Sequence, residues 1–235
     1  MPELDGPDAP ADIDLGGGVA FLHTPSIPSR GGLALTHGAG GNCESLLLQR
    51  IAAVWTAAGF TVLRFDLPFR VRKPKGPPHP SRSAEDRLGI AAAVERLRTE
   101  TDGFVAFGGH SYGGRQGSMI AAEQPGLVDG LVLTSYPLHP PGKPDKARTQ
   151  HLPELRTPTV VVHGTKDPFG TTAELSAALA LVPAPTLLTD IEGAGHDLAP
   201  TKYDAATKTL AGAASLFGAP ASDSSIVVPL FDPSR

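Results

Sequence analysis

The sequence contains a single cysteine, Cys43, among its 235 residues. No intrachain disulfide can form, and no cysteine-rich metal site is expected. The sequence also lacks an apolar run near the roughly 18 residues needed to cross a bilayer. Its acidic start, rich in proline and glycine, lacks the basic and apolar regions of a signal peptide. We therefore predict no membrane association, no metal site and a cytoplasmic location.

A strong excess of charge of either sign is missing as well. The formal net charge is −4 and charged residues make up 19% of the chain, so no positive field is available to attract nucleic acid. Hydrophobic residues make up 40%, a share typical of a globular protein with a sizeable core. A chain of this length can form one domain.

The two ends of the chain differ from its middle in composition. We predict a flexible N-terminal arm over residues 1–18, a folded domain over 19–218 and a C-terminal tail over 219–235. The tail contains "IVVPLF", which either stays disordered or docks as an extra strand, and the sequence leaves both alternatives open.

Between these ends, short apolar strands alternate with helices. Strands are predicted over 19–24, 33–37, 60–66, 104–109, 128–137, 158–164 and 185–191. Helices are predicted over 44–59, 83–100, 112–124, 171–182 and 202–217, with Ser83 and Asp86 placed for a capping box. Strands joined by crossover helices predict an α/β fold with a mainly parallel sheet and helices on both faces.

Two proline-rich connections interrupt this alternation, over residues 68–83 and 138–155. Each follows a strand, so each should emerge at the carboxyl edge of the sheet, where open α/β sheets place their sites. The first connection is basic and contains Arg70, Arg72, Lys73, Lys75 and Arg82.

Ser111 stands between Gly109 and Gly113 at the predicted turn from a strand into a helix. This G-x-S-x-G pattern is typical of a nucleophile elbow, a turn so tight that only glycine fits two positions before and after the serine. A glycine-rich turn with an incidental serine is the alternative. The strand before the pattern and the helix after it favour a nucleophile.

A serine nucleophile needs a histidine base and a carboxylate that orients it, in the chain order Ser, acid, His. The histidines after Ser111 are His139, His151, His163 and His196. His196 follows the last predicted strand in a glycine-containing loop, so we predict it as the base. Asp167 follows the preceding strand and is predicted as the acid, with Asp190 as its main competitor; His163 is interpreted as structural.

An oxyanion hole requires two backbone N–H donors. The pattern predicts Tyr112, directly after the serine, and Ala39 in the loop "HGAGGN". Gly40, His139 and Arg115 are further candidates for binding substrate, and His37 is expected to brace its loop.

The motifs "LTHGAGGN", "LRFDLPFR", "GGHSYGGR", "GLVLTSYPLHPPGKP", "VVVHGTKDPFG" and "EGAGHDL" resemble the α/β-hydrolase superfamily. They are most similar to compact members related to dienelactone hydrolase, in a branch with testis-expressed-protein-like and NSL-complex-subunit-like proteins. The resemblance covers residues 35–198 and implies a single-domain hydrolase fold with no or minimal lid and no cofactor. It also implies a Ser111–His196–Asp167 triad.

These residues together predict a serine hydrolase that cleaves an acyl ester or thioester of a small molecule through an acyl-enzyme intermediate. The basic connection over 68–83 is favoured as a solvated loop, with two alternatives left open: a contact surface for a partner, or a group of cations beside the site that favours an anionic acyl or CoA-like substrate. The alternatives to a serine hydrolase are a non-catalytic interaction or scaffold protein on a hydrolase fold, and a dinucleotide-binding module with Asp66 in the ribose position. The second alternative is weakened because Cys43 replaces the third glycine of its fingerprint; Cys43 itself is interpreted as structural.

Overall fold

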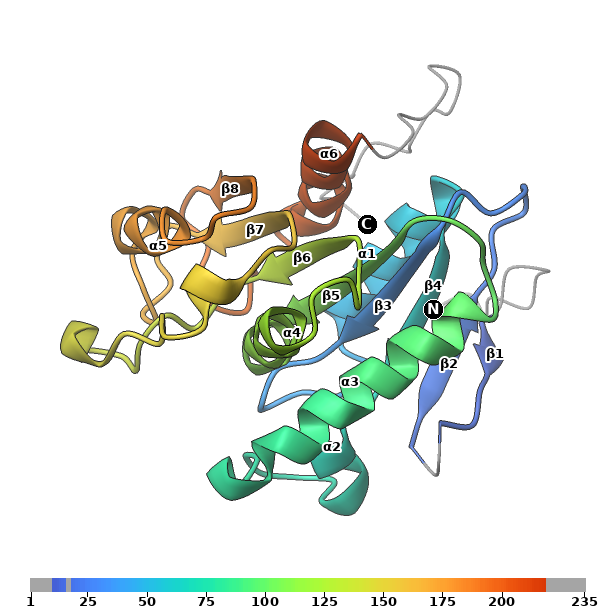
Figure 1. The fold of residues 1–235 in the computed structure, drawn as a ribbon, viewed down its shortest axis with the longest axis horizontal. Coiled ribbons are helices and arrows are strands. Elements are labelled where there is room, and N and C mark those ends of the chain that lie inside the picture. The colour runs from blue at the N-terminus through green and yellow to red at the C-terminus, as the bar shows by residue number, and fades with distance from the viewer. Residues whose placement is uncertain (1–9, 16–17, 219–235) are drawn as a thin grey trace.

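The described residues form one central sheet of eight strands (Figure 1). The computed structural model describes residues 10–15 and 18–218, so the predictions that concern 1–9, 16–17 and 219–235, the docking of "IVVPLF" included, lie outside the described residues. The strands are β1 (Ala11–Asp12), β2 (Ala20–His23), β3 (Gly32–Thr36), β4 (Thr61–Phe65), β5 (Val105–His110), β6 (Gly130–Thr134), β7 (Thr159–Gly164) and β8 (Thr186–Ile191).

The strands neighbour one another in the order β1-β2-β4-β3-β5-β6-β7-β8. β1 pairs with β2, and β2 with β4, in antiparallel fashion at one edge. Every other pairing in the sheet is parallel. The predicted α/β fold with a mainly parallel sheet is therefore confirmed.

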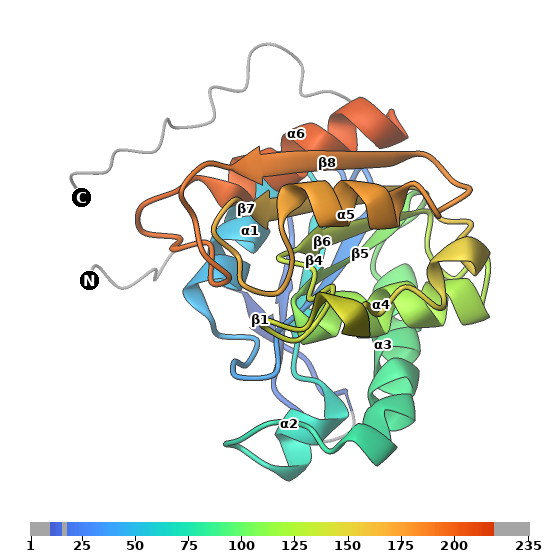
Figure 2. The same cartoon turned by 90° about the vertical axis from the view of Figure 1, so that its left-hand side faces the viewer.

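Helices cover both faces of this sheet, as predicted (Figures 1 and 2). They are α1 (Leu46–Ala57), α2 (Pro68–Arg72), α3 (Ser83–Arg98), α4 (Tyr112–Glu123), α5 (Thr172–Leu179) and α6 (Ala205–Phe217). Helices α1 and α6 pack on one face, and α3, α4 and α5 pack on the other. Each face has its own apolar cluster, and the two clusters are separated by the sheet.

The central strands supply side chains to both clusters in alternation. In β7, Val160 and Val162 enter the cluster under α1 and α6, whereas Val161 enters the cluster under α3 and α4. All six residues of β7 are buried. This is why the sequence shows a continuous apolar run there and not the alternating pattern of a strand with one wet face.

The carboxyl ends of the parallel strands lie together at one edge of the sheet. The register pairs Thr36 of β3 with Gly109 of β5, and His110 of β5 with Thr134 of β6. His163 of β7 pairs with Asp190 of β8. The loops that follow β3, β5, β7 and β8 therefore emerge side by side, although they are far apart in the sequence.

Two segments predicted to be irregular contain short regular elements. Residues 11–12, within the predicted arm, pair with β2, and Ile13 N–H donates to Ala20 O at 3.0 Å. The sequence does not predict this strand, because two residues are too few to show periodicity. In the first proline-rich connection, Pro68 opens helix α2, a position that proline favours.

The predicted capping box at the start of α3 is wrong. Ser83 is already inside the helix, and no side chain caps its N-terminus. Asp86 is fully buried: its carboxylate accepts the Phe69 N–H at 2.9 Å and the Tyr112 hydroxyl at 2.7 Å. Two tertiary hydrogen bonds to a buried carboxylate thus replace one local cap.

The connection after β6 holds no lid domain. Residues 135–158, all of them described, contain only two single-turn 3-10 helices, Pro144–Lys146 and Leu152–Glu154. This confirms the expectation of no or minimal lid. Within residues 10–15 and 18–218, no helix combines the length and the apolar character required to span a bilayer.

The edge formed by β2 and β4 contains a hydrogen bond that depends on a neutral histidine. Arg64 is 5% exposed, and its Nε–H donates to Nε2 of His23 at 2.8 Å. Protonation of His23 would remove this acceptor and set two cations against each other. Burial first, and then the Arg64 cation, lower the pKa of His23 to about 4.

We predict that the free energy of unfolding falls as the pH drops from about 6.5 to about 4. An unfolded histidine titrates near 6.5 and therefore binds more protons than folded His23 in this window. His23→Gln retains an acceptor oxygen but cannot titrate, so it should lose less stability over the same window. Urea unfolding near pH 7 and near pH 4 measures the two losses, and equal losses would contradict the prediction.

Candidate active site

Ser111 occupies the turn between β5 and α4 in a backbone conformation that non-glycine residues rarely adopt. Its φ is 50° and its ψ is −115°. Such a conformation costs on the order of 1–3 kcal/mol and persists only where the surroundings enforce it. The strained turn predicted from G-x-S-x-G is therefore present in the structure.

The two flanking glycines are required by close backbone approaches. A Cβ on Gly109 would lie 2.5 Å from the backbone nitrogen of Gly114, and a Cβ on Gly113 would lie 2.4 Å from the carbonyl oxygen of His37. Neither obstacle can move aside, because both are main-chain atoms. The start of α4 is thus pressed directly against the end of β3.

Three side chains from different loops converge at this turn. Nε2 of His196 lies 2.8 Å from Oγ of Ser111, and Nδ1 of His196 lies 2.8 Å from Oδ2 of Asp167. An ionised carboxylate can only accept, so the hydrogen of the neutral imidazole is on Nδ1 and the Nε2 lone pair faces the serine hydroxyl. The arrangement can move a proton from Ser111 to His196.

The surroundings of Asp167 hold its carboxylate in place. Asp167 is 5% exposed, and its Oδ1 accepts the Phe169 N–H at 2.9 Å. The Phe169 ring lies over the His196 ring with centroids 4.2 Å apart. His163 is fully buried and its Nε2 bonds to Gly170 O at 2.8 Å, which agrees with a structural role.

Two other carboxylates near the sequence motifs play no part in this chain of hydrogen bonds. Asp190, the competing acid, accepts the Thr172 hydroxyl at 3.1 Å. Asp197, which follows His196 in the same loop, accepts the Ala199 N–H at 3.2 Å.

The loop after β3 passes close to Ser111. A Cβ on Gly38 would lie 3.2 Å from the Cβ of Ser111. In the described part of the chain, the N–H groups of Ala39 and Tyr112 have no hydrogen-bond acceptor. The structure therefore leaves free the two donors that the sequence predicts for an oxyanion hole.

Arg70 does not face the cavity, contrary to the anionic-substrate alternative for the basic connection. It is 5% exposed, and its guanidinium donates to four backbone carbonyls. These are Ala39 O at 2.8 Å, Gly41 O at 2.8 Å, Lys73 O at 3.1 Å and Gly76 O at 3.3 Å. One buried arginine thus ties the loop after β3 to the loop after α2.

The other cations of this connection also fail to line the cavity. Arg72 forms an ion pair with Glu85 at 2.5 Å, in an exposed position. The alternative that gives residues 68–83 an electrostatic role beside the site is therefore corrected: the sequence shows that the segment is basic but cannot show which way its side chains point.

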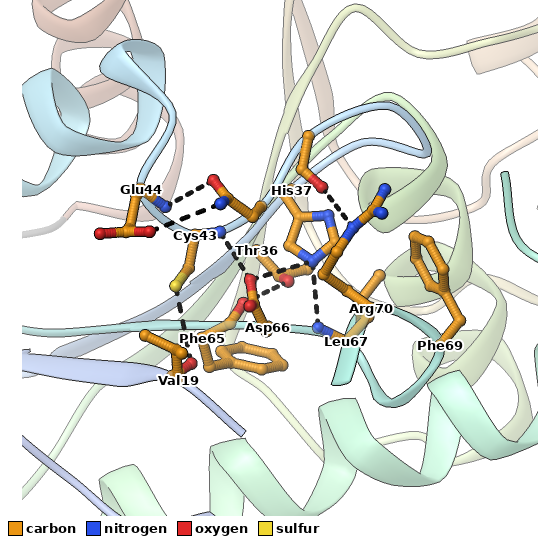
Figure 3. Close-up of polar contacts among 12 residues, drawn as sticks. Val19, Thr36, His37, Cys43, Glu44, Phe65, Asp66, Leu67, Phe69 and Arg70 are labelled. Carbon is orange, nitrogen blue, oxygen red and sulfur yellow. Dashed lines mark hydrogen bonds and ion pairs between the residues drawn. The ribbon is translucent and has the colours of Figure 1, made fainter. Parts of the chain in front are cut away.

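His37 also holds the loop after β3 in place (Figure 3). Its Nε2 accepts the Leu67 N–H at 3.1 Å, which leaves Nδ1 to donate to Gly38 O at 2.8 Å. Burial lowers the pKa of His37, in keeping with a neutral ring. The structure agrees with the bracing role inferred from the sequence.

The Asp66 carboxylate also accepts a hydrogen bond within the protein (Figure 3). Its Oδ1 accepts the Cys43 N–H at 2.7 Å, and its side chain is 10% exposed. It is therefore not placed to bind a ribose. Burial, followed by the charge of Asp66, raises the pKa of the Cys43 thiol, so this cysteine remains an unreactive, structural residue.

A cavity of about 780 Å³ opens beside Ser111. Both proline-rich connections contribute to its wall, through Pro78 and Pro80 from the first and Arg148 from the second. Of the predicted substrate-binding residues, Gly40 and Arg115 line the cavity.

His139, the remaining predicted substrate-binding residue, is not among the residues that line this cavity. Its Nε2 lies 3.3 Å from Oε2 of Glu174, and its Nδ1 bonds to Pro140 O at 2.9 Å. The His139 side chain therefore points toward the first turn of α5, an orientation that the sequence does not predict.

The sequence analysis missed several cavity residues, among them His110, Arg148 and Phe169. His110 precedes the serine, and burial lowers its pKa to about 4, so it stays neutral beside His196. The position of Phe169, two residues after the predicted acid, was the only available signal for it. Nothing in the sequence singled out Arg148.

Comparison with known proteins identifies the family of this chain. Residues 29–216 match a family described as "Alpha/beta hydrolase domain". A dienelactone hydrolase from Anabaena variabilis is similar over 89% of this chain and 98% of its own, with 23% identity and a TM-score of 0.69. An α/β serine hydrolase without lid from Xanthomonas campestris matches 92% of this chain and 98% of its own, with 18% identity and a TM-score of 0.71. These two likenesses concern the fold.

We predict that Arg70→Lys lowers the free energy of unfolding by about 1–3 kcal/mol, since a lysine cannot satisfy four carbonyls arranged around a planar fork. The matched control is Arg72→Lys, two residues away and exposed, which should change stability by no more than about 0.5 kcal/mol. Denaturant unfolding of both variants measures the difference. Equal effects would show that the buried fork does not hold the loop.

Proposed function

The chain belongs to the alpha/beta hydrolase domain family, and from that premise we propose that it is a serine hydrolase that cleaves an acyl ester or thioester of a small molecule. Ser111 is the nucleophile, His196 the general base and Asp167 the residue that orients the base. The sub-branch suggested by the sequence motifs and the cytoplasmic location stay predictions, as does the absence of nucleic-acid and membrane partners.

The observation that carries this proposal is the unbroken hydrogen-bonded chain from Ser111 through His196 to Asp167, with both contacts at 2.8 Å. Its middle member is the most accessible, at 24% exposure, and Asp167 at its far end is sealed from solvent. This arrangement suits the role of each group, because Ser111 and His196 line the cavity where substrate would lie, while the orienting carboxylate is kept from exchanging partners with water.

In the proposed reaction, His196 Nε2 takes the Ser111 proton as Oγ attacks the acyl carbonyl carbon. The carbonyl π electrons move onto oxygen, and the tetrahedral intermediate collapses when His196 returns the proton to the leaving alcohol or thiol. Water then attacks the acyl-enzyme in the same manner, which releases the carboxylic acid and restores the serine hydroxyl. Asp167 stabilises the imidazolium that forms in each half.

The developing oxyanion is assigned to the N–H groups of Ala39 and Tyr112. Their lack of an acceptor and the closeness of the loop to Ser111 support this assignment. Hydrogen bonds of two residues that do not take part in the reaction keep these donors in place. Arg70 fixes the loop of Ala39 through its carbonyl oxygen, and Asp86 fixes Tyr112 through its hydroxyl. Preorganised donors of this kind need no rearrangement when charge develops.

The size of the cavity favours a small-molecule substrate. A volume of about 780 Å³ lies within the range of small-ligand pockets. The cavity wall is formed by loops of the domain itself, since no lid domain covers the site among residues 135–158.

We predict that Ser111→Ala abolishes labelling by a fluorophosphonate probe and lowers kcat for p-nitrophenyl acetate by several orders of magnitude, since no other group can form the acyl intermediate. Gel-based labelling and a spectrophotometric assay measure the two effects.

The matched control is Ser118→Ala. Ser118 forms the other serine–histidine contact on α4, with Oγ 2.8 Å from Nε2 of His151, but it is fully buried. This variant should label like wild type. Equal labelling of wild type and Ser111→Ala, or no hydrolysis of any ester by wild type, would instead favour a non-catalytic role on a hydrolase fold.

A further inference from the structure

Two arginine side chains line the same cavity as the proposed nucleophile. Arg115 lies one helical turn after Ser111, and its N–H donates to the Ser111 carbonyl at 2.9 Å. Its side chain is half-buried and lines the cavity. Its Nε is buried and has no hydrogen-bond partner in the described part of the molecule. A buried guanidinium N–H without an acceptor is costly, so a structural bracing role within the chain does not explain this arginine.

Arg148 reaches the same cavity from the connection after β6. Its Nη1 donates to Pro137 O at 3.0 Å, and its backbone N–H donates to Leu138 O at 2.8 Å. These bonds fix the side chain at the wall and still leave most of its guanidinium donors free. Burial, followed by repulsion from the positive charge of Arg115, lowers the pKa of Arg148.

No carboxylate balances this pair. Among residues 10–15 and 18–218, no Asp or Glu lies within ion-pair distance of Arg115 or Arg148. The carboxylate of Asp197 also lines the cavity, but it is not within ion-pair distance of either arginine. Two other polar residues near the pair are held uncharged: burial and Arg115 lower the pKa of His151 to about 4, and burial raises the pKa of the Tyr136 phenol. By contrast, Arg72, Arg87, Arg96 and Arg98 all pair with carboxylates.

We propose that Arg115 and Arg148 form a subsite that binds an anionic oxygen group, a carboxylate or a phosphate, on the ester substrate. This inference deepens the proposed function and rests on it for the position of the scissile bond. Two guanidinium forks can donate charge-assisted hydrogen bonds to both oxygens of a carboxylate, or to several oxygens of a phosphate. A preference for an anionic substrate would therefore come from Arg115 on α4 and Arg148 after β6, and not from the cations of the 68–83 connection.

The test compares two esters that differ only in charge, mono-p-nitrophenyl glutarate and its methyl ester. The wild type should show a higher kcat/KM for the free acid, and this advantage should shrink as salt is added. In Arg115→Met and in Arg148→Met, the ratio of the two kcat/KM values should fall by about tenfold or more, as expected for the loss of a charged hydrogen bond. Arg156→Met, at an exposed arginine that does not line the cavity, is the matched control and should retain the ratio.

Arg115→Lys keeps the charge but loses the fork, and it serves if the methionine variant fails to fold. Its ratio should lie between those of wild type and Arg115→Met. Competition by glutarate and by inorganic phosphate in the same assay distinguishes the two anions, because the preferred one inhibits at the lower concentration.

A direct binding measurement separates the failure of the subsite from the failure of the enzyme. Calorimetric binding of glutarate or phosphate to Ser111→Ala, lost in Ser111→Ala/Arg115→Met, would support the subsite even if neither ester is hydrolysed. The proposal is overturned if neither anion binds Ser111→Ala and the wild type hydrolyses both esters with a ratio that no arginine variant changes. It is also overturned if anions bind equally well without Arg115 and Arg148.

Discussion

The contact between the start of α4 and the end of β3 is the constraint on which the site depends. Gly113 lies against the carbonyl of His37 so closely that a Cβ would stand 2.4 Å from that oxygen. The contact holds Ser111 in its left-handed conformation and fixes the loop of Ala39 beside it. In the proposed mechanism, the hydroxyl that attacks and the N–H groups that receive the resulting charge are therefore positioned by one steric fit between two main-chain segments.

The sheet brings the remaining groups to this point. Asp167 and His196 follow β7 and β8, which lie on the same side of β5 in parallel register. Because parallel strands end at a common edge, residues separated by 85 positions in the chain meet within hydrogen-bond distance. Nearly all of β5 and all of β7 are buried, so the loops that contain Ser111 and Asp167 follow closely packed strands.

Much of this arrangement could be predicted because it follows from backbone rules. Apolar runs, the glycines around Ser111 and the positions of Asp167 and His196 after strands are local signals, and the parallel topology converts them into an expected meeting point. The errors concern side-chain direction. Nothing in the sequence separates Arg70, which turns inward to four carbonyls, from Arg72, which turns outward to Glu85. Likewise, Asp86 prefers two tertiary partners over the local cap that its position predicts.

The most direct test of the central claim is to trap the acyl-enzyme during turnover of p-nitrophenyl acetate. We expect a burst of p-nitrophenol close to one equivalent per active site if deacylation is the slower step. Under that condition the acyl-enzyme accumulates, and acid quenching followed by peptide mass spectrometry should locate an acetyl group on Ser111. An acetyl group found on another residue while Ser111 stays unmodified would contradict the account.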